Sequence, residues 1–91
     1  MLKSMIVTEI EVIEKKVGFV NLLDLSSLAY TIMGKTESEG FYKLFYRAAK
    51  EGWGIGQLCI EIQRTGKTMG KEEDGKMLAE QVRTKLEEKR V

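Results

Sequence analysis

The sequence predicts a mainly α-helical protein, a small compact bundle of four to five helices in a single domain spanning residues 1–91. Apolar residues recur every three or four positions over most of the chain, which is the period of an amphipathic helix. The chain has nine glycines and no proline. The glycines at 18, 34, 52 and 66 separate the helical patterns. A hydrophobic content of 43% supports a folded core, although a chain of 91 residues buries only a modest one.

The N-terminal segment, residues 5–23, leaves an α+β fold open as the alternative. Apolar side chains at positions 6, 10, 13 and 17 have helical spacing. The same stretch is rich in β-branched residues, and residues 9–12 alternate between acidic and apolar as in a strand. With a turn at Lys15 and Lys16 and a return over residues 17–23, it would form a short β-hairpin. Helix and strand are both compatible with this pattern.

Residues 25–33 predict the first clear helix. Asp24 or Ser26 can cap its first N–H groups, and Gly34 stands where a left-handed residue ends a helix. The apolar face consists of Leu25, Leu28, Ala29 and Ile32.

Residues 37–50 predict the next helix. Thr36 and Glu39 have the spacing of a capping box, in which the hydroxyl and the carboxylate bond to each other's backbone N–H group. Lys50 lies in the last turn, where a cation complements the helix dipole, and Gly52 ends the helix. The apolar face consists of Phe41, Leu44, Phe45 and Ala48.

Residues 55–64 also predict a helix, and a strand is the second interpretation. Ile55, Leu58, Cys59 and Ile62 have helical spacing, whereas Leu58, Ile60 and Ile62 alternate. Gly66 is expected to stop the element.

Residues 72–89 predict the last helix. Its narrow apolar stripe of Leu78, Val82 and Leu86 suits packing along one seam, in the same chain or in a partner. Opposite charges four residues apart, Glu72 with Lys76 and Arg83 with Glu87, favour ion pairs on its polar sides.

The composition argues against catalysis. The chain has no histidine and one cysteine, so it lacks the commonest general base, the commonest metal ligand and the partner of a nucleophilic thiol. The Gly66-Lys67-Thr68 sequence lacks the glycine that a phosphate-binding loop requires five residues earlier, where Glu61 stands. We therefore expect no enzyme activity, no metal and no cofactor. No segment is apolar enough to span a membrane, and a cytoplasmic location is the default expectation.

A basic and aromatic helix face is the first candidate binding feature. Lys43, Arg47 and Lys50 are spaced along one side of the 37–50 helix, beside Tyr42 and Tyr46. Cations and aromatic rings on one surface can hold a phosphate backbone or stack on unpaired bases. The alternative is an ordinary solvated face whose tyrosines pack at the edge of the core.

The second candidate feature is the helix, glycine-containing turn and helix over residues 54–83. This stretch resembles the helix-turn-helix class of DNA-binding domains over about 30 residues. The resemblance implies that residues near the start of the second helix contact DNA: Arg64, Lys67, Thr68 and Lys71. The predicted turn of about seven residues is longer than the class uses, and acids open the second helix. A simple helical hairpin is the alternative.

Two functions follow from these features. The first is a small nucleic-acid-binding accessory or regulatory protein, with DNA or RNA as its partner, which uses the basic residues named above. The alternative is a homo-oligomeric interaction module without catalytic activity. A homodimer of this kind would use Trp53 and the stripe of Leu78, Val82 and Leu86 as its interface. For Trp53, a place in the core over the helix junction is the favoured interpretation.

Overall fold

The computed structural model describes residues 16–88 of the chain. This part contains a 3₁₀ turn, η1 (Phe19–Asn21), followed by four α-helices. The helices are α2 (Leu22–Met33), α3 (Lys35–Glu51), α4 (Ile55–Thr68) and α5 (Glu72–Glu88). The predicted small α-helical bundle is therefore confirmed, and residues 55–64 are helix, not strand.

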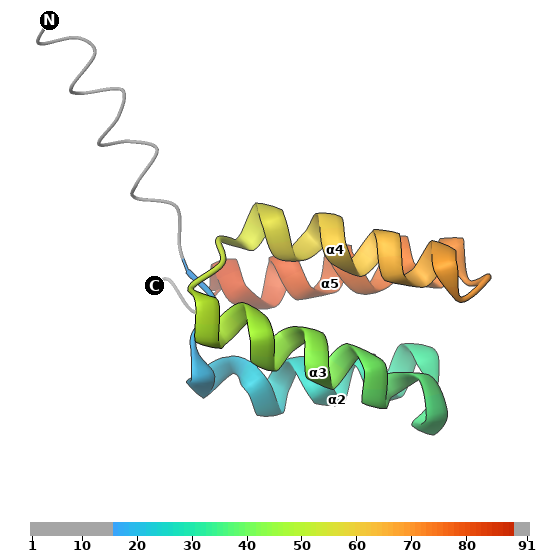
Figure 1. Ribbon diagram of the computed structural model, residues 1–91, viewed down its shortest axis with the longest axis horizontal. Helices are drawn as coiled ribbons and strands as arrows, with labels where there is room; N and C mark the ends of the chain where they lie inside the picture. The colour runs from blue at the N-terminus through green and yellow to red at the C-terminus, as the bar shows by residue number, and fades with distance from the viewer. Residues whose placement is uncertain (1–15, 89–91) are drawn as a thin grey trace, which may run out of the picture.

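The four helices run alternately up and down, so that neighbours in sequence are antiparallel (Figure 1). α2 and α3 form one hairpin and α4 and α5 form the other, and the two hairpins pack against each other. Short connections between successive helices favour this arrangement. The turn between α2 and α3 and the turn between α4 and α5 consequently lie at the same end of the bundle (Figure 1).

The core lies between the two hairpins. Every predicted apolar face points into it, since a helix in a bundle buries one stripe and exposes the other. Leu28, Ile32 and Leu44 are only partly buried at its edge. The buried apolar side chains are Val17, Leu25, Ala29, Met33, Phe41, Phe45, Ala48, Ala49, Trp53, Ile55, Leu58, Cys59, Ile62, Leu78, Ala79, Val82 and Leu86.

The prediction of a second β-hairpin arm over residues 17–23 is wrong. Residues 17–23 include η1 and the start of α2, and the chain around Lys16 makes a single antiparallel bridge to Gly54. The Val17 N–H group donates to the Trp53 carbonyl at 2.8 Å. The Asn21 side chain explains the turn, because its Oδ1 accepts from the Gly18 N–H group at 2.9 Å. The first arm, residues 5–14, lies outside the described residues.

Two predicted helix caps are wrong, because α2 and α3 begin earlier than expected. α2 starts at Leu22, so Asp24 and Ser26 lie inside it. α3 starts at Lys35, so Thr36 cannot cap it. The early start of α3 is explained by Gly34, which with φ at 95° reverses the chain between the two helices by itself. The Ser38 N–H group then donates to the Gly34 carbonyl.

Gly66 does not end α4, which continues for two more residues to Thr68. Gly66 is buried against Gly75 of α5, and a Cβ atom added to Gly66 would lie 2.8 Å from the Gly75 Cα atom. The glycine therefore serves a close helix crossing. The reversal falls instead at Gly70, whose φ is 79°.

The predicted ion pairs of the last helix are present. The Lys76 Nζ lies 4.0 Å from the Glu72 Oε2, and the Arg83 guanidinium lies 3.6 Å from the Glu87 Oε2. All four side chains are exposed, so each pair contributes only a few tenths of a kcal/mol, roughly 0.3–0.5. Among residues 16–88, no helix has the length and apolar content that a membrane crossing needs.

Candidate functional site

The cations predicted on α3 are exposed, but one of them is engaged. Lys43 and Lys50 extend into solvent. The Arg47 Nε donates to the Glu51 carboxylate at 3.0 Å, and its guanidinium lies 5.4 Å from the centre of the Trp53 ring. Arg47 therefore covers one face of the tryptophan ring.

The predicted residues at the end of α4 are only partly available. Lys67 is exposed and makes no ion pair within residues 16–88. The Arg64 guanidinium pairs with Glu61 at 3.5 Å, and Arg64 remains 70% exposed. The Thr68 hydroxyl donates to the Arg64 carbonyl at 3.0 Å, so it already has a hydrogen-bond partner within the helix.

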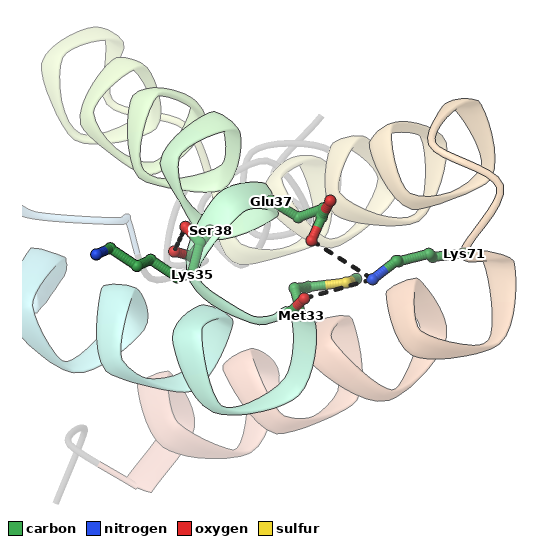
Figure 2. Close-up of polar contacts among 5 residues, drawn as sticks. All are labelled: Met33, Lys35, Glu37, Ser38 and Lys71. Carbon is green, nitrogen blue, oxygen red and sulfur yellow. Dashed lines mark hydrogen bonds and ion pairs between the residues drawn. The ribbon is translucent and has the colours of Figure 1, made fainter.

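Lys71 is partly buried and makes contacts between the two turns. Its Nζ donates to the Met33 carbonyl at 3.4 Å and to the Glu37 carboxylate at 3.5 Å (Figure 2). Met33 ends α2 and Glu37 lies in the first turn of α3. Lys71 therefore connects the α4–α5 turn to the α2–α3 turn.

The contact between Lys71 and Glu37 also locates the cations of α3 relative to those near the α4–α5 turn. Glu37 marks the start of α3, whereas Lys50 lies in its last turn. At 1.5 Å per residue, these positions are about 20 Å apart along the helix. Lys50 therefore lies toward the opposite end of the bundle from Lys71, whereas Lys43 lies at the middle of α3.

The C-terminal half has the predicted order of helix, turn and helix, with a shorter turn than expected. The turn is residues 69–71, which matches the length typical of helix-turn-helix proteins. However, α4 and α5 lie antiparallel side by side along their lengths (Figure 1). Helices of the DNA-binding motif cross at about 90–120°, so this pair is an αα-hairpin.

The four residues predicted at an interface are buried within this chain. Leu78 and Val82 are fully buried, Leu86 is 1% exposed and Trp53 is 7% exposed. The narrow stripe of α5 thus packs in the core of its own chain. Trp53 occupies the favoured core position, and its indole N–H donates to the Glu51 carboxylate at 3.0 Å.

The outer side of the α2–α3 hairpin carries an aromatic surface that the sequence analysis missed. Phe19 and Tyr46 meet edge to face, with ring centres 5.6 Å apart. Tyr30 and Tyr42 line a hollow of about 330 Å³ between α2 and α3. Leu23 lies two helical turns before Tyr30, on the same side of α2. We call Phe19, Leu23, Tyr30, Tyr42 and Tyr46 the aromatic face.

The sequence contained only part of the signal for this face. The spacing of Tyr42 and Tyr46 places them together on α3, where the sequence shows them only as neighbours of the cations. Nothing in the sequence places Phe19 or Tyr30 beside them. The packing of α2 against α3 decides that contact.

The outer side of the α4–α5 hairpin carries a basic depression of about 360 Å³. It lies between the end of α4 and the first turns of α5, and it is lined by Gln63, Arg64, Lys67, Glu72 and Lys76. Lys76 and Gln63 were not among the predicted binding residues, because the sequence does not show which residues of the two helices face each other.

The one cysteine of the chain is a core residue. Cys59 is 5% exposed, and its Sγ donates to the Ala79 carbonyl at 3.5 Å. Burial raises the pKa of the Cys59 thiol above its ordinary value, which disfavours the reactive thiolate. Within residues 16–88, no three Cys, Asp or Glu side chains are grouped so that they could hold a metal ion.

No protein family model matches the chain, and comparisons with curated proteins and with solved structures gave no match either. The aromatic face and the basic depression are the two candidate functional surfaces among the described residues.

Proposed function

We propose that this protein is a homo-oligomeric interaction module without catalytic activity, which associates with a second copy of itself through the aromatic face. The observation that carries this proposal is the gathering of large exposed apolar side chains on one side of the α2–α3 hairpin. Leu23 is 81% exposed, Tyr30 57% and Phe19 54%, and Tyr42 and Tyr46 are close to half exposed.

The composition of the aromatic face suits a protein interface. Aromatic residues are enriched at interface centres, and contiguous apolar patches on a soluble monomer often mark an interaction site. Burying a side chain such as Leu23 or Phe19 contributes about 1.5–3 kcal/mol relative to leaving it in water. The hollow beside Tyr30 and Tyr42 offers a shape into which a partner's side chain can fit.

The charges beside the aromatic face favour a second copy as the partner. Glu39 and Lys43 line the same hollow, and in the described part of the chain neither forms an ion pair. In a dimer whose two-fold axis crosses α3 midway between these two residues, Glu39 of each copy would face Lys43 of its partner. The net charge of +1 gives two copies little repulsion at long range.

Sedimentation equilibrium of the full chain tests the proposal. The unaltered protein is expected to be a dimer, and Leu23→Glu is expected to give a monomer, because it places a carboxylate in the interface. Ile60→Glu on α4 is the matched control, since Ile60 is also exposed, at 59%, but lies outside the aromatic face. A monomeric unaltered protein at high concentration, or equal dissociation by the two substitutions, would contradict the proposal.

The arrangement of the two copies can be tested by exchanging charges. Glu39→Lys and Lys43→Glu are each expected to weaken the dimer, because each places like charges opposite one another. The double variant restores opposite charges and is expected to recover dimerisation. Failure of the double variant to recover would rule out the reversed α3 pairing, while the Leu23→Glu result would still test association itself.

Nucleic-acid binding is the second candidate function, and the basic depression favours it. Of the residues predicted near the second helix, Arg64 and Lys67 line the depression, whereas Lys71 is occupied by Glu37. Binding to duplex DNA should weaken as salt rises, and Lys67→Glu should weaken it further. The absence of binding at low salt would exclude this candidate.

A further inference from the structure

The basic depression owes its form to the closest approach of α4 and α5. At the crossing, Gly66 and Gly75 are so close that a Cβ atom on either would lie 3.2 Å or less from the other's Cα atom. Lys67 and Lys76 directly follow these two glycines in sequence. The crossing therefore brings a lysine from each helix to the rim of one depression.

The lining of the depression has an excess of positive charge. Three cations, Arg64, Lys67 and Lys76, share the lining with one carboxylate, Glu72, and Arg64 also pairs with Glu61 at 3.5 Å. Glu72 lies 4.0 Å from Lys76, and both side chains are 57% exposed. Exposed ion pairs of this kind contribute little stability, so these cations can leave their carboxylate partners for an anion that binds them more tightly.

We propose that the basic depression binds a phosphate group. The Arg64 guanidinium can donate two parallel hydrogen bonds to phosphate oxygens, and the lysines supply point charges from the two helices. The Gln63 amide adds a neutral donor. The net positive charge of these side chains favours an anionic phosphate, and a volume of about 360 Å³ holds a phosphate together with the group it is attached to.

This proposal does not depend on self-association, since the depression lies on the α4–α5 hairpin and the aromatic face on the α2–α3 hairpin. It also applies whether the phosphate is part of a nucleic-acid backbone or free in solution. Both sources present negatively charged phosphate oxygens, and separate titrations with the two distinguish them.

Nuclear magnetic resonance of the full chain can test the site directly. Inorganic phosphate and a short single-stranded oligothymidine are titrated separately at low ionic strength, with chloride as the reference anion. We expect saturable shifts of the backbone amides of residues 63–67 and 72–76. Shifts with phosphate alone would assign the site to a free phosphate, and shifts with both ligands to a site that also accepts a nucleic-acid backbone.

The variant Lys67→Gln removes one charge from the depression and is expected to weaken binding about tenfold, the effect of losing one charge-assisted contact. Lys76→Gln should act similarly. Lys35→Gln is the matched control, because Lys35 is also an exposed lysine whose side chain points away from Lys71 and the α4–α5 turn (Figure 2).

Two results would overturn the proposal. One is the absence of saturable shifts with either ligand. The other is equal weakening by Lys35→Gln and Lys67→Gln, which would show diffuse attraction to the whole surface. Sedimentation of the same variants reports separately on self-association, so failure of the phosphate site leaves that proposal to its own test.

Discussion

At the scale of single residues, the burial of the Trp53 side chain determines the contacts that its neighbours make. Its ring packs at the core beneath Arg47, and its indole N–H bonds to Glu51. The hydrogen bond from Arg47 and then that from Trp53 hold the pKa of Glu51 below its ordinary value. Arg47, predicted as a nucleic-acid contact, is thus part of a local structural cluster.

This cluster predicts that the surroundings of Trp53 change with pH. Because Trp53 is the only tryptophan of the chain, its fluorescence can report the change. The pKa of Glu51 is lower in the folded state than in the unfolded state. The ionised carboxylate therefore stabilises the folded state at pH values above its ordinary pKa, and this stabilisation is lost as the pH falls through the folded-state pKa. Trp53 fluorescence should change with a midpoint below the ordinary glutamate pKa. Glu51→Gln should abolish the transition and Glu73→Gln, an exposed control, should retain it. An unchanged transition in Glu51→Gln would disprove the assignment.

At the scale of elements, the glycines have two different structural roles in one sequence. Some reverse the chain between helices, and others let two helices pack closely. Gly34 and Gly70 have positive φ and reverse the chain, as glycines between helical patterns are expected to do. Gly66 has helical geometry and allows contact with Gly75 instead. The backbone conformation of each glycine and the residue that faces it distinguish these roles.

The crossing predicts a pair of alanine substitutions with effects of opposite sign. In Gly66→Ala, the new Cβ atom would lie 2.8 Å from the Gly75 Cα atom and 3.1 Å from the Lys71 carbonyl, so the backbone must shift. We expect the free energy of unfolding to fall by about 1–3 kcal/mol.

Gly40→Ala is the matched control in α3. Its new Cβ atom meets only the flexible end of Met69 at 3.4 Å, so the better helix propensity of alanine should raise the free energy of unfolding by about 0.5–1 kcal/mol. Urea unfolding followed by circular dichroism measures both variants. Equal effects would mean that the close crossing does not limit packing.

At the scale of the whole molecule, the bundle separates its two candidate surfaces. The aromatic face lies on α2 and α3 together with η1, and the basic depression lies on α4 and α5. Association through the first leaves the second open to solvent. A dimer would therefore carry two phosphate sites, and a polyanion long enough to reach both would bind more tightly than to one.

Dimerisation also predicts how the melting temperature responds to concentration. Association stabilises the folded state by mass action, so the Tm of the unaltered protein should rise as its concentration rises. The Tm of Leu23→Glu should not depend on concentration, whereas Ile60→Glu should behave like the unaltered protein. Differential scanning calorimetry over a wide concentration range checks this expectation, and a constant Tm of the unaltered protein would count against the dimer.

Much of the fold could be predicted, because helical periodicity records which side of each element is buried. The apolar stripes of residues 25–33, 37–50, 55–64 and 72–89 all contribute to the core. Helix ends were less predictable, as Thr36 and Gly66 show, because a cap or a break depends on the contacts around it. The candidate sites were predicted only in part: Arg64 and Lys67 line the basic depression, whereas Lys71 contacts Met33 and Glu37 and Trp53 is buried in the core.

By itself, the sequence determined the helical bundle, its core stripes and the lack of histidine-based chemistry. These depend on residue types and on spacing within one helix. The tertiary structure alone decided that Phe19 meets Tyr46, that Lys67 and Lys76 share one depression, and that Lys71 binds Glu37. The physical reason is that such contacts join different helices, and their relative position is set by packing of the whole core.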